Sequence, residues 1–303
     1  MKILITGATG LVGVEIVKLC LAKKYTVHYL TTSKTKIVNE KNYKGFYWDP
    51  STQEIDKNCL IGIDAIINLA GASISKKWTT SHKKAILNSR IDSLRLLHRL
   101  LSENKHTVKQ LCSASALGIY PSSLTEKYDE SYDFVSSSFL GEVVKAWEKA
   151  IDSFQSIDLK ITKIRIGIVL SNDGGALAEM IRPMKLGVGA PLGSGKQWQS
   201  WIHITDLANM FLFVLKQKLS GIYNAAASNP VTNAELTKAI AKQLKKRLFL
   251  PNVPTFMMNL ILGEMSAIVL ESQYLKNDKI KKDDFVFEYD TLEDALTNVI
   301  TRN

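Results

Sequence analysis

The sequence has few cysteines and no recognisable metal motif. Cys20, Cys59 and Cys112 are its only thiols, and no two of them form a C-x-x-C pair. The five histidines form neither an H-x₃-H nor an H-E-x-x-H pattern. Scattered thiols are typical of a reduced protein and exclude a disulfide framework. We therefore expect a cytoplasmic protein without a metal site.

Long apolar runs are also missing. No run approaches the roughly 18 residues that a helix needs to cross a bilayer. The opening residues M-K-I-L-I-T-G lead straight into a predicted strand rather than a secretory signal. The most apolar late segment, Phe256 to Leu270, is interrupted by Asn259 and Glu264. We predict an amphipathic packed helix there, and no membrane partner.

Acidic residues are scarce relative to basic ones, since 29 Asp+Glu against 39 Lys+Arg give a formal charge of +10. The lysines are spread along the chain without a helix-turn-helix or RNP signature, which favours solvated surfaces over nucleic-acid binding. A basic protein does suit an anionic ligand such as a phosphorylated cofactor. Apolar residues at 46% and charged residues at 22% are the balance of a globular chain.

The first half of the chain alternates short apolar runs with amphipathic stretches. Strands separated by helices imply βαβ units, and hence a parallel sheet covered on both faces. We predict an α/β fold, a Rossmann-like doubly wound sheet with a smaller C-terminal α/β region on the substrate side. The predicted strands span residues 2–6, 26–31, 45–48, 65–69, 110–113 and 160–168.

The character of the chain changes after Leu170. Glycines cluster from Gly174 to Gly195 among prolines and tryptophans, a composition typical of loops that shape a pocket. Helices are predicted from Asp206, interpreted as an N-cap, and from about Asn233. The expected organisation is a nucleotide-binding domain over 1–170, to which about 200–227 return, and a substrate-side region over 171–303 with a small domain at about 250–300.

The most informative motif is G-A-T-G-L-V-G at residues 7–13, which follows the first predicted strand and opens a helix. Gly7 permits a tight turn, Gly10 lets the backbone approach a pyrophosphate, and Gly13 allows close helix–strand packing. The helix N-terminus offers unpaired N–H groups and a positive dipole end to an anion. The motif predicts dinucleotide binding, with a purely structural turn as the weaker alternative.

The segment after the second strand bears on the choice of cofactor. An acid there would bind the 2′-hydroxyl of NAD, yet no Asp or Glu lies between Glu15 and Glu40. The segment reads T-T-S-K-T-K, so Thr32, Ser33 and Lys34 can accommodate a 2′-phosphate. We predict NADP, with NAD as the alternative if these are merely solvated loop residues.

Two later strand ends lie at the same predicted edge. Asp49 is positioned to accept from the adenine amino group, or alternatively to close a turn before Pro50. The sequence N-L-A-G at residues 68–71 ends the fourth strand with small residues, which allow close approach of a cofactor.

Several blocks, in order along the chain, carry a family resemblance. They are T-G-A-T-G-L-V-G at 6–13, N-L-A-G-A-S-I at 68–74, W-T-T-S-H-K-K-A-I-L-N-S-R at 78–90, S-A-S-A-L-G-I-Y at 113–120, R-I-G-I-V-L-S-N-D-G-G-A-L at 165–177, L-G-S-G-K-Q-W-Q-S-W-I-H-I-T-D-L at 192–207, G-E-M at 263–265 and F-x-F-E-Y at 285–289. The chain resembles the extended short-chain dehydrogenase/reductases over essentially its whole length. It is most similar to their atypical "epimerase family protein" group, some of whose members are labelled cell-division inhibitor.

The resemblance implies further cofactor contacts. Arg90 falls where a helix passes the nicotinamide side, with surface pairing to Asp92 or Glu142 as the alternative. Relatives usually have an arginine where this chain has Thr32. This departure weakens the prediction of NADP but does not reverse it. The predicted cofactor-binding residues are Gly7, Thr9, Gly10, Leu11, Val12, Gly13, Thr31, Thr32, Ser33, Lys34, Asp49, Leu69, Ala70, Gly71, Arg90 and Val169.

The usual proton relay of the superfamily is not present in the sequence. It needs a tyrosine four residues before a lysine, and no tyrosine of this chain has lysine at that spacing. The family register through Glu148 places Leu140 and Val144 at these positions. Ser115 occupies the expected serine position, and Tyr120 or Tyr132 is a candidate to replace the missing tyrosine. Ser115 and Tyr120 are therefore the predicted catalytic residues.

Basic and aromatic side chains of the later loops are candidates for binding a small, polar, anionic substrate. The tryptophans and His203 have a structural interpretation as well. The resemblance implies an NADP-dependent epimerase or oxidoreductase. Leu140 and Val144 at the relay positions favour the alternative, a non-catalytic regulator or redox sensor. Relatives often form dimers, so a homodimer through residues 84–101 and 139–151 is a further possibility. The substrate candidates are Arg182, Lys196, Gln197, Trp201 and His203.

Overall fold

The computed structural model describes residues 1–301, in which a mixed, mostly parallel sheet forms the centre. Its strand order is β13-β9-β7-β6-β1-β2-β4-β3, with β5 paired to β4. The pairs that involve β3 and β5 are antiparallel. The strands are β1 (Lys2–Thr6), β2 (Thr26–Thr31), β3 (Asn39–Glu40), β4 (Tyr43–Asp49), β5 (Glu54–Ile55), β6 (Ala65–Asn68), β7 (Gln110–Ala116), β9 (Lys160–Ile166) and β13 (Gly221–Ala225).

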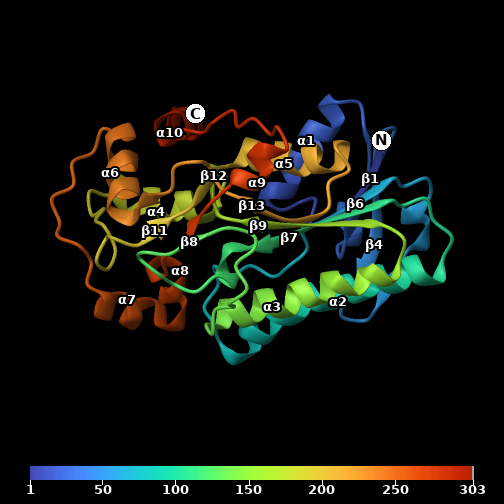
Figure 1. Ribbon diagram of the computed structural model, residues 1–303, viewed down its shortest axis with the longest axis horizontal. Helices are drawn as coiled ribbons and strands as arrows, with labels where there is room; N and C mark the ends of the chain where they lie inside the picture. Colours follow the sequence, from blue (N-terminus) through green and yellow to red (C-terminus); the bar gives the residue numbers. More distant parts are fainter. Residues whose placement is uncertain (302–303) are drawn as a thin grey trace.

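Helices cover both faces of this sheet, which confirms the predicted doubly wound fold. In Figure 1, α2 and α3 lie together on one side of the sheet, and α1 and α5 lie together on the other. Because both faces are covered, β1 carries an unbroken apolar run, and Ile3, Leu4 and Ile5 have no exposed surface. The four helices are α1 (Leu11–Ala22), α2 (Thr80–Glu103), α3 (Phe139–Asp152) and α5 (Ile204–Lys216).

The strand order reverses between β1 and β6. From β1 the chain builds outward through β2 and β4, and it then returns to β6 and builds the other way. The connections leaving the carboxyl ends of β1 and β6 therefore diverge to opposite sides. In open α/β sheets, ligands bind at this switch point.

A smaller region packs at one end of the sheet, around a core that includes Leu177, Trp201, Leu236 and Leu296. Figure 1 shows α4, α6, α7 and α10 at the end of the molecule away from β4. The remaining elements of the chain are shorter. They are β8 (Lys127–Tyr128), β10 (Ile168–Leu170), β11 (Trp198–Gln199), β12 (Trp201–His203), β14 (Val231–Thr232), β15 (Tyr274–Leu275), α4 (Gly175–Lys185), α6 (Asn233–Gln243), α7 (Thr255–Leu262), α8 (Ala267–Leu270), α9 (Asp278–Lys282) and α10 (Leu292–Thr301), with the 3₁₀ turns η1 (Lys34–Lys36), η2 (Lys57–Leu60), η3 (Leu117–Ile119), η4 (Ser153–Ser156) and η5 (Gly263–Ser266).

The strands predicted over 45–48 and 110–113 are longer in the structure, and two other predicted boundaries are wrong for a clear structural reason. The strand predicted over 160–168 breaks at Gly167, where a Cβ would overlap with the carbonyl oxygen of Ser200, so β10 begins a separate small sheet. The helix predicted from Asp206 begins at Ile204, because the His203 ring accepts from the N–H of Thr205 as the N-cap. Asp206 instead accepts from the backbone N–H groups of Glu288 and Tyr289.

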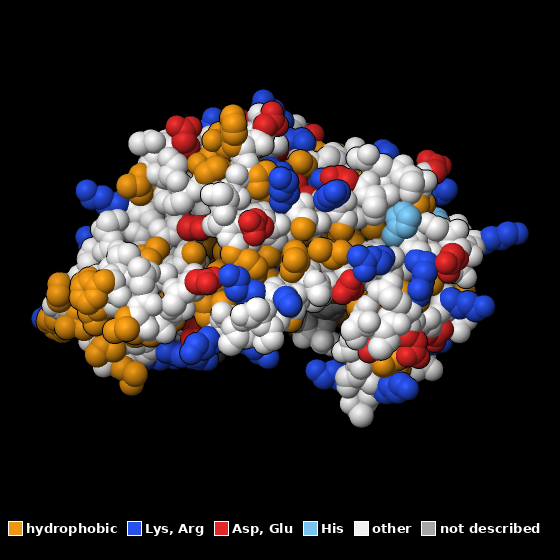
Figure 2. Space-filling view, turned by 90° about the horizontal axis from the view of Figure 1, so that it is seen from below, with side chains coloured by type: hydrophobic (Ala, Val, Ile, Leu, Met, Phe, Trp, Pro, Cys, Tyr) orange, Lys and Arg blue, Asp and Glu red, His pale blue; other side chains and the backbone are white. Residues whose placement is uncertain are grey.

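The packed helix predicted over Phe256 to Leu270 is also wrong. The helix stops at Gly263, which has a φ of +57°. Phe256, Leu260 and Ile261 of α7 are 70%, 82% and 69% exposed. Figure 2 shows apolar side chains gathered at the end of the molecule that carries this helix. None of the helices in residues 1–301 combines the length and apolar character that a bilayer crossing requires.

Candidate functional site

The glycine turn lies at the switch point, and each glycine of the motif has a different structural role. Gly7 has a φ of +70°, and a Cβ on it would lie 3.0 Å from the carbonyl group of Leu69. A Cβ on Gly13 would overlap with the carbonyl oxygen of Gly7. Gly10 has an ordinary extended conformation, with φ −84° and ψ 172°. Gly7 and Gly13 are therefore required by the fold, whereas Gly10 is not.

The N-terminus of α1 lacks the side-chain cap that other helices of the chain have. Thr79, Ser138, His203 and Thr232 cap α2, α3, α5 and α6 with a side-chain acceptor. Gly10 provides no such group, and the first turn of α1 has no acidic residue. Because Thr9 and Gly10 are exposed, the turn offers backbone N–H groups and a positive helix end to an anion from solvent. The geometry therefore fits the diphosphate of a dinucleotide.

A second glycine pair lies against this turn. Gly174 and Gly175 have φ values of +151° and +74°, and a Cβ on Gly175 would lie 3.1 Å from the Leu11 side chain. The loop before α4 thus closes onto the start of α1. It brings the smaller region of the chain beside the glycine turn, a contact that the sequence motif does not reveal.

A buried polar chain fastens the strand ends around the turn. The Thr6 hydroxyl donates to Asn68 Oδ1 over 2.8 Å and accepts from the N–H groups of Leu69 and Ala70. Asn68 Nδ2 donates to Ser113 Oγ over 2.9 Å. These bonds link β1, β6 and β7 at their carboxyl ends and fix the backbone of Leu69 and Ala70 beside Gly7.

The predicted 2′-phosphate segment follows β2 on the same edge. Thr31 is buried, and its hydroxyl accepts from the N–H of Ser33. Thr32 and Lys34 are exposed, and Lys34 Nζ lies 4.8 Å from the ring centre of Tyr47 on β4. The structure therefore brings hydroxyl groups and one ammonium group together at the end of β2.

Asp49 forms a turn after β4. One carboxylate oxygen accepts from both the backbone N–H and the hydroxyl of Ser51, and these bonds hold the pKa of Asp49 below its ordinary value. This geometry matches the turn interpretation. A contact between Asp49 and adenine remains a prediction, as does any role for Val169, which lies on β10 beside Ile202.

Arg90 is partly buried and has no carboxylate partner among the described residues. Its Nη1 donates to the carbonyl oxygens of Ile86 and Ala72, and its guanidinium lies 4.9 Å from the ring centre of Trp147. Burial lowers the pKa of Arg90 to about 10. Pairing with Asp92 or Glu142 is not observed.

The surroundings of Arg90 also account for a glycine. A Cβ on Gly71 would lie 3.0 Å from Arg90 Cζ, so the small residue makes room for the guanidinium rather than for open space. Arg90 Nε and Trp147 Nε1 are both buried without a hydrogen-bond partner in the described structure. An uncompensated cation thus lies beside the turn that follows β6.

The positions expected to hold the proton relay are apolar and packed. Val144 is 3% exposed and belongs to a small core with Ile119, Tyr120 and Tyr128. Leu140 lies against Gly118, on which a Cβ would be 3.1 Å from Leu140 Cβ. Neither position offers an ionisable group.

Ser115 is tied into a buried ionic cluster. It is 1% exposed, and its hydroxyl donates to Glu148 Oε1 over 2.6 Å. Arg165 donates to both oxygens of Glu148 over 2.9 and 3.0 Å. Burial by itself raises the pKa of Glu148, but the bonds and charge of Arg165, together with Ser115 and Lys163, leave that pKa below its ordinary value. The only hydroxyl proton of Ser115 is therefore held by a carboxylate.

Tyr120 belongs to the same cluster. It has no exposed surface, and its hydroxyl accepts from Arg165 Nη1 and lies 2.8 Å from Asn224 Oδ1. Burial raises the pKa of Tyr120 to about 12, although Arg165 and Asn224 act in the opposite direction. A catalytic tyrosine needs a lowered pKa and access to substrate, so this geometry does not support the predicted role. The alternative Tyr132 packs edge-on against Tyr128.

The predicted substrate residues do not converge on one surface. Trp201 and His203 are 0% and 1% exposed, and the Trp201 indole donates to the carbonyl oxygen of Asn229. Gln197 is buried and donates to the carbonyl oxygens of Leu192 and Val269. Arg182 is exposed and pairs with Glu179, while Lys196 is exposed elsewhere. Trp201 and Gln197 therefore stabilise the smaller region, and His203 caps α5.

Comparison with known proteins identifies the family. A sequence profile of the NAD dependent epimerase/dehydratase family matches residues 3–226. The chain belongs to this family. A second profile, a domain of unknown function named DUF1731, matches residues 253–299 of this epimerase-family chain. The predicted family resemblance is therefore confirmed.

Individual relatives agree with this assignment over the whole chain. An epimerase family protein of Staphylococcus aureus (strain MRSA252) is 37% identical over 306 residues, covering 99% of each chain. The structure of human epimerase family protein SDR39U1 with NADPH has a TM-score of 0.87 at 26% identity and covers 100% of both chains. UDP-glucose 4-epimerase of Thermus thermophilus with NAD shares the fold, with a TM-score of 0.79 at 20% identity over 99% of this chain and 98% of that one.

Proposed function

We propose that this epimerase-family chain binds NADP(H) at the glycine turn and acts as an atypical epimerase or oxidoreductase on a small, polar, anionic substrate. The observation that carries the proposal is the open, uncapped turn at Gly10, held between the structurally required Gly7 and Gly13. The relatives support a nicotinamide nucleotide, since one similar structure contains NADPH and another contains NAD.

The preference for NADP(H) rests on the end of β2. No carboxylate lies between Glu15 and Glu40, whereas Lys34 lies on the exposed turn after Thr31. A carboxylate there would repel a 2′-phosphate, and an ammonium group attracts it. Discrimination is expected to be moderate, because Lys34 is exposed and screened by solvent.

When bound, the nucleotide would supply hydride chemistry. The chain's own residues would bind the diphosphate at the α1 N-terminus, hold the Leu69–Ala70 backbone beside it, and place the Arg90 cation near the same turn. Ser115 and Tyr120 would support the sheet edge through the Glu148–Arg165 pair rather than exchange protons with substrate.

Calorimetric titration of NADPH and NADH into the purified protein tests the cofactor proposal. We expect NADPH to bind at least about tenfold more tightly, a difference of ~1.4 kcal/mol. Lys34→Gln should reduce NADPH affinity and leave NADH affinity unchanged. Lys23→Gln is the matched control, because Lys23 is an exposed lysine at the other end of α1. Equal affinities for the two nucleotides would contradict the choice of NADP(H).

A non-catalytic NADP(H)-binding regulator or sensor is the second candidate. It is favoured by the apolar packing of Leu140 and Val144 and by the saturation of Ser115. NADPH consumption with a panel of carbonyl compounds and nucleotide sugars separates the two. Turnover that survives Ser115→Ala supports the atypical enzyme, and turnover abolished by it restores Ser115 as catalytic. Tight NADPH binding without turnover across the panel supports the regulator.

A further inference from the structure

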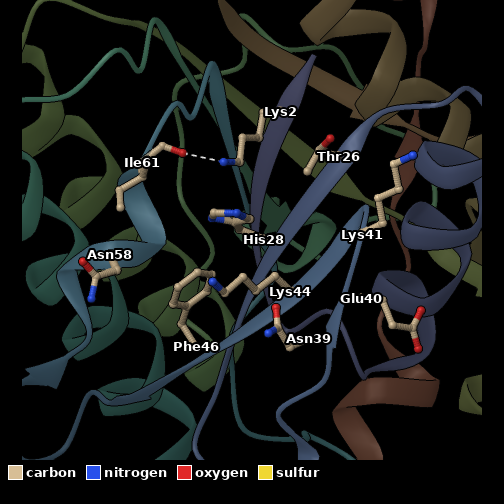
Figure 3. Close-up of a pocket in the computed structure, with 10 residues that line it drawn as sticks. All are labelled: Lys2, Thr26, His28, Asn39, Glu40, Lys41, Lys44, Phe46, Asn58 and Ile61. Atoms are coloured by element: carbon tan, nitrogen blue, oxygen red, sulfur yellow. Dashed lines mark hydrogen bonds between the residues drawn. The ribbon is translucent and has the colours of Figure 1, made fainter.

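A charged hollow lies at the edge of the sheet opposite to the glycine turn. It has a volume of about 440 Å³ and is lined from the amino-terminal parts of β1, β2 and β4. Figure 3 shows Lys2, His28 and Lys44 converging there from these three strands. None of the predicted cofactor, catalytic or substrate residues lines this hollow.

The hollow carries excess positive charge. Lys2, Lys41 and Lys44 line it, against a single carboxylate, Glu40. Lys2 Nζ donates to the carbonyl oxygen of Ile61 over 2.6 Å, and Lys44 Nζ lies 5.3 Å from the ring centre of Phe46. Within residues 1–301, no carboxylate forms an ion pair with any of these three ammonium groups. Convergent unpaired cations favour an anionic ligand.

His28 adds a hydrogen-bond acceptor to this basic wall. Its side chain is buried, at 5% exposure, and Nδ1 lies 2.8 Å from the carbonyl oxygen of Cys59. A carbonyl oxygen only accepts, so Nδ1 carries the proton, and Nε2 of the neutral ring holds a lone pair. Nε2 has no partner in the described chain, and it is not among the atoms sealed from solvent. It is therefore available to a ligand that donates a proton.

The neutral form of this ring is favoured by its surroundings. Burial lowers the pKa of His28, the bond to Cys59 opposes this effect, and the charges of Lys2 and Lys44 lower the pKa further. At neutral pH, the hollow thus combines ammonium donors with one imidazole acceptor. A suitable ligand must carry both negative charge and a hydroxyl proton.

We propose that this hollow binds inorganic phosphate, with Lys2 and Lys44 contacting its charged oxygens and His28 Nε2 accepting from a P–OH group. Inorganic phosphate keeps at least one such proton at neutral pH. Sulfate does not, and phosphate monoesters lose theirs with a second pKa of about 6. The proposal therefore predicts selection of free phosphate over sulfate and over phosphate monoesters.

Calorimetric titration at pH 7.5 and constant ionic strength, in a phosphate-free buffer, tests this selection. The probes are inorganic phosphate, sulfate and glycerol phosphate, and the histidine ring signals are followed by NMR in parallel. We expect saturable phosphate binding with a shift at His28, and at least about tenfold weaker binding of the other two anions. Equal binding of phosphate and sulfate, or no phosphate binding, would overturn the proposal.

Variants separate the hollow from the rest of the surface. Lys44→Gln should weaken phosphate binding by about tenfold, since it removes a charge-assisted hydrogen bond. Lys23→Gln removes an exposed lysine outside the hollow and should change nothing. His28→Asn keeps a donor near the Cys59 carbonyl but deletes Nε2, so phosphate and sulfate should bind alike. Equal losses in Lys44→Gln and Lys23→Gln would show only a general charge effect and would overturn the proposal.

Binding of phosphate at the glycine turn is a separate event that this design distinguishes. Gly10→Val fills the space beside that turn and lies at the other edge of the sheet. Phosphate binding that persists in Gly10→Val and is lost in Lys44→Gln supports the hollow. The opposite pattern would assign the phosphate to the cofactor turn and reject the proposal.

Discussion

The edge of the sheet that faces the expected cofactor is built in two different ways. After β1 the chain keeps side chains away from the turn, so that the backbone N–H groups at the start of α1 have no side-chain cap. After β7, Ser115 and Tyr120 are tied to Glu148 and Arg165 in a closed cluster. The first region leaves donors without side-chain partners, and the second holds strands and α3 together.

This contrast separates binding from acid–base chemistry. In a protein with the Tyr–Lys relay, the same edge must hold a nucleotide and move a proton. Here the groups nearest the relay positions are apolar or already hydrogen-bonded, while the nucleotide turn keeps its geometry. Substitutions in the two regions should therefore affect different properties, stability in the cluster and affinity in the turn.

The largest effect is expected in the ionic cluster. Glu148→Gln leaves the buried Arg165 guanidinium without a counter-charge, which should lower the free energy of unfolding by about 3–5 kcal/mol. Urea denaturation measures the loss. Asp152→Asn is the matched control, because this more exposed partner of Lys163 should contribute at most about 1 kcal/mol. A Glu148→Gln protein as stable as the control would contradict the proposed role of the cluster.

The glycine turn should show the reverse pattern. Gly10→Val needs no unusual backbone conformation, and its Cβ meets only the Gly7 carbonyl oxygen at 3.3 Å. We expect it to weaken NADPH binding by at least about 30-fold, or ~2 kcal/mol, with little change in urea stability. Val14→Ala, an exposed substitution on α1, controls for effects on the helix. A large loss of stability in Gly10→Val would remove the distinction between the two regions.

Arg90 tests where the two regions meet. Arg90→Met keeps an unbranched side chain beside Trp147 but removes the guanidinium, a charge that has no carboxylate partner among residues 1–301. If the cation serves an anionic ligand, NADPH affinity should fall by about tenfold while stability is unchanged or higher. A substantial loss of stability without loss of affinity would instead make Arg90 a structural residue of the 69–72 turn.

The smallest effect is a dependence of stability on pH. The folded protein holds the pKa of Glu148 below its ordinary value of about 4.3. Its stabilising contribution is therefore complete above that value and is lost as the pH falls through the lower, folded-state pKa. Urea denaturation between pH 5 and about pH 3 should give a shallower decline for Glu148→Gln than for wild type. Parallel declines would contradict the assigned pKa direction.

The sequence was sufficient for the parts of the fold that rest on local patterns. The runs at 2–6 and 26–31 match β1 and β2, and the glycine turn lies where the motif predicts, because apolar periodicity and positive φ angles are local properties. The position of Asp206 was not predictable in this way. Its partners are backbone groups 82 and 83 residues away, at Glu288 and Tyr289.

The same limit applies to the candidate site. The sequence predicts Ser115 at the end of a strand, as observed, but its partner Glu148 lies 33 residues further along, and Arg165 lies on another strand. Only the fold brings these three together, and their mutual hydrogen bonds change the interpretation of Ser115. The sequence likewise predicts a packed helix for the apolar residues of α7, which are exposed, because spacing alone does not show which neighbour covers a helix face.

The most direct test compares NADPH binding by three proteins in one calorimetric series: wild type, Gly10→Val and Ser115→Ala. If the open turn binds the nucleotide and the closed cluster takes no part, wild type and Ser115→Ala will bind NADPH with the same Kd, and Gly10→Val will bind it at least about 30-fold more weakly. Affinity that is retained in Gly10→Val, or lost in Ser115→Ala, would contradict the division of this edge into a binding region and a structural one.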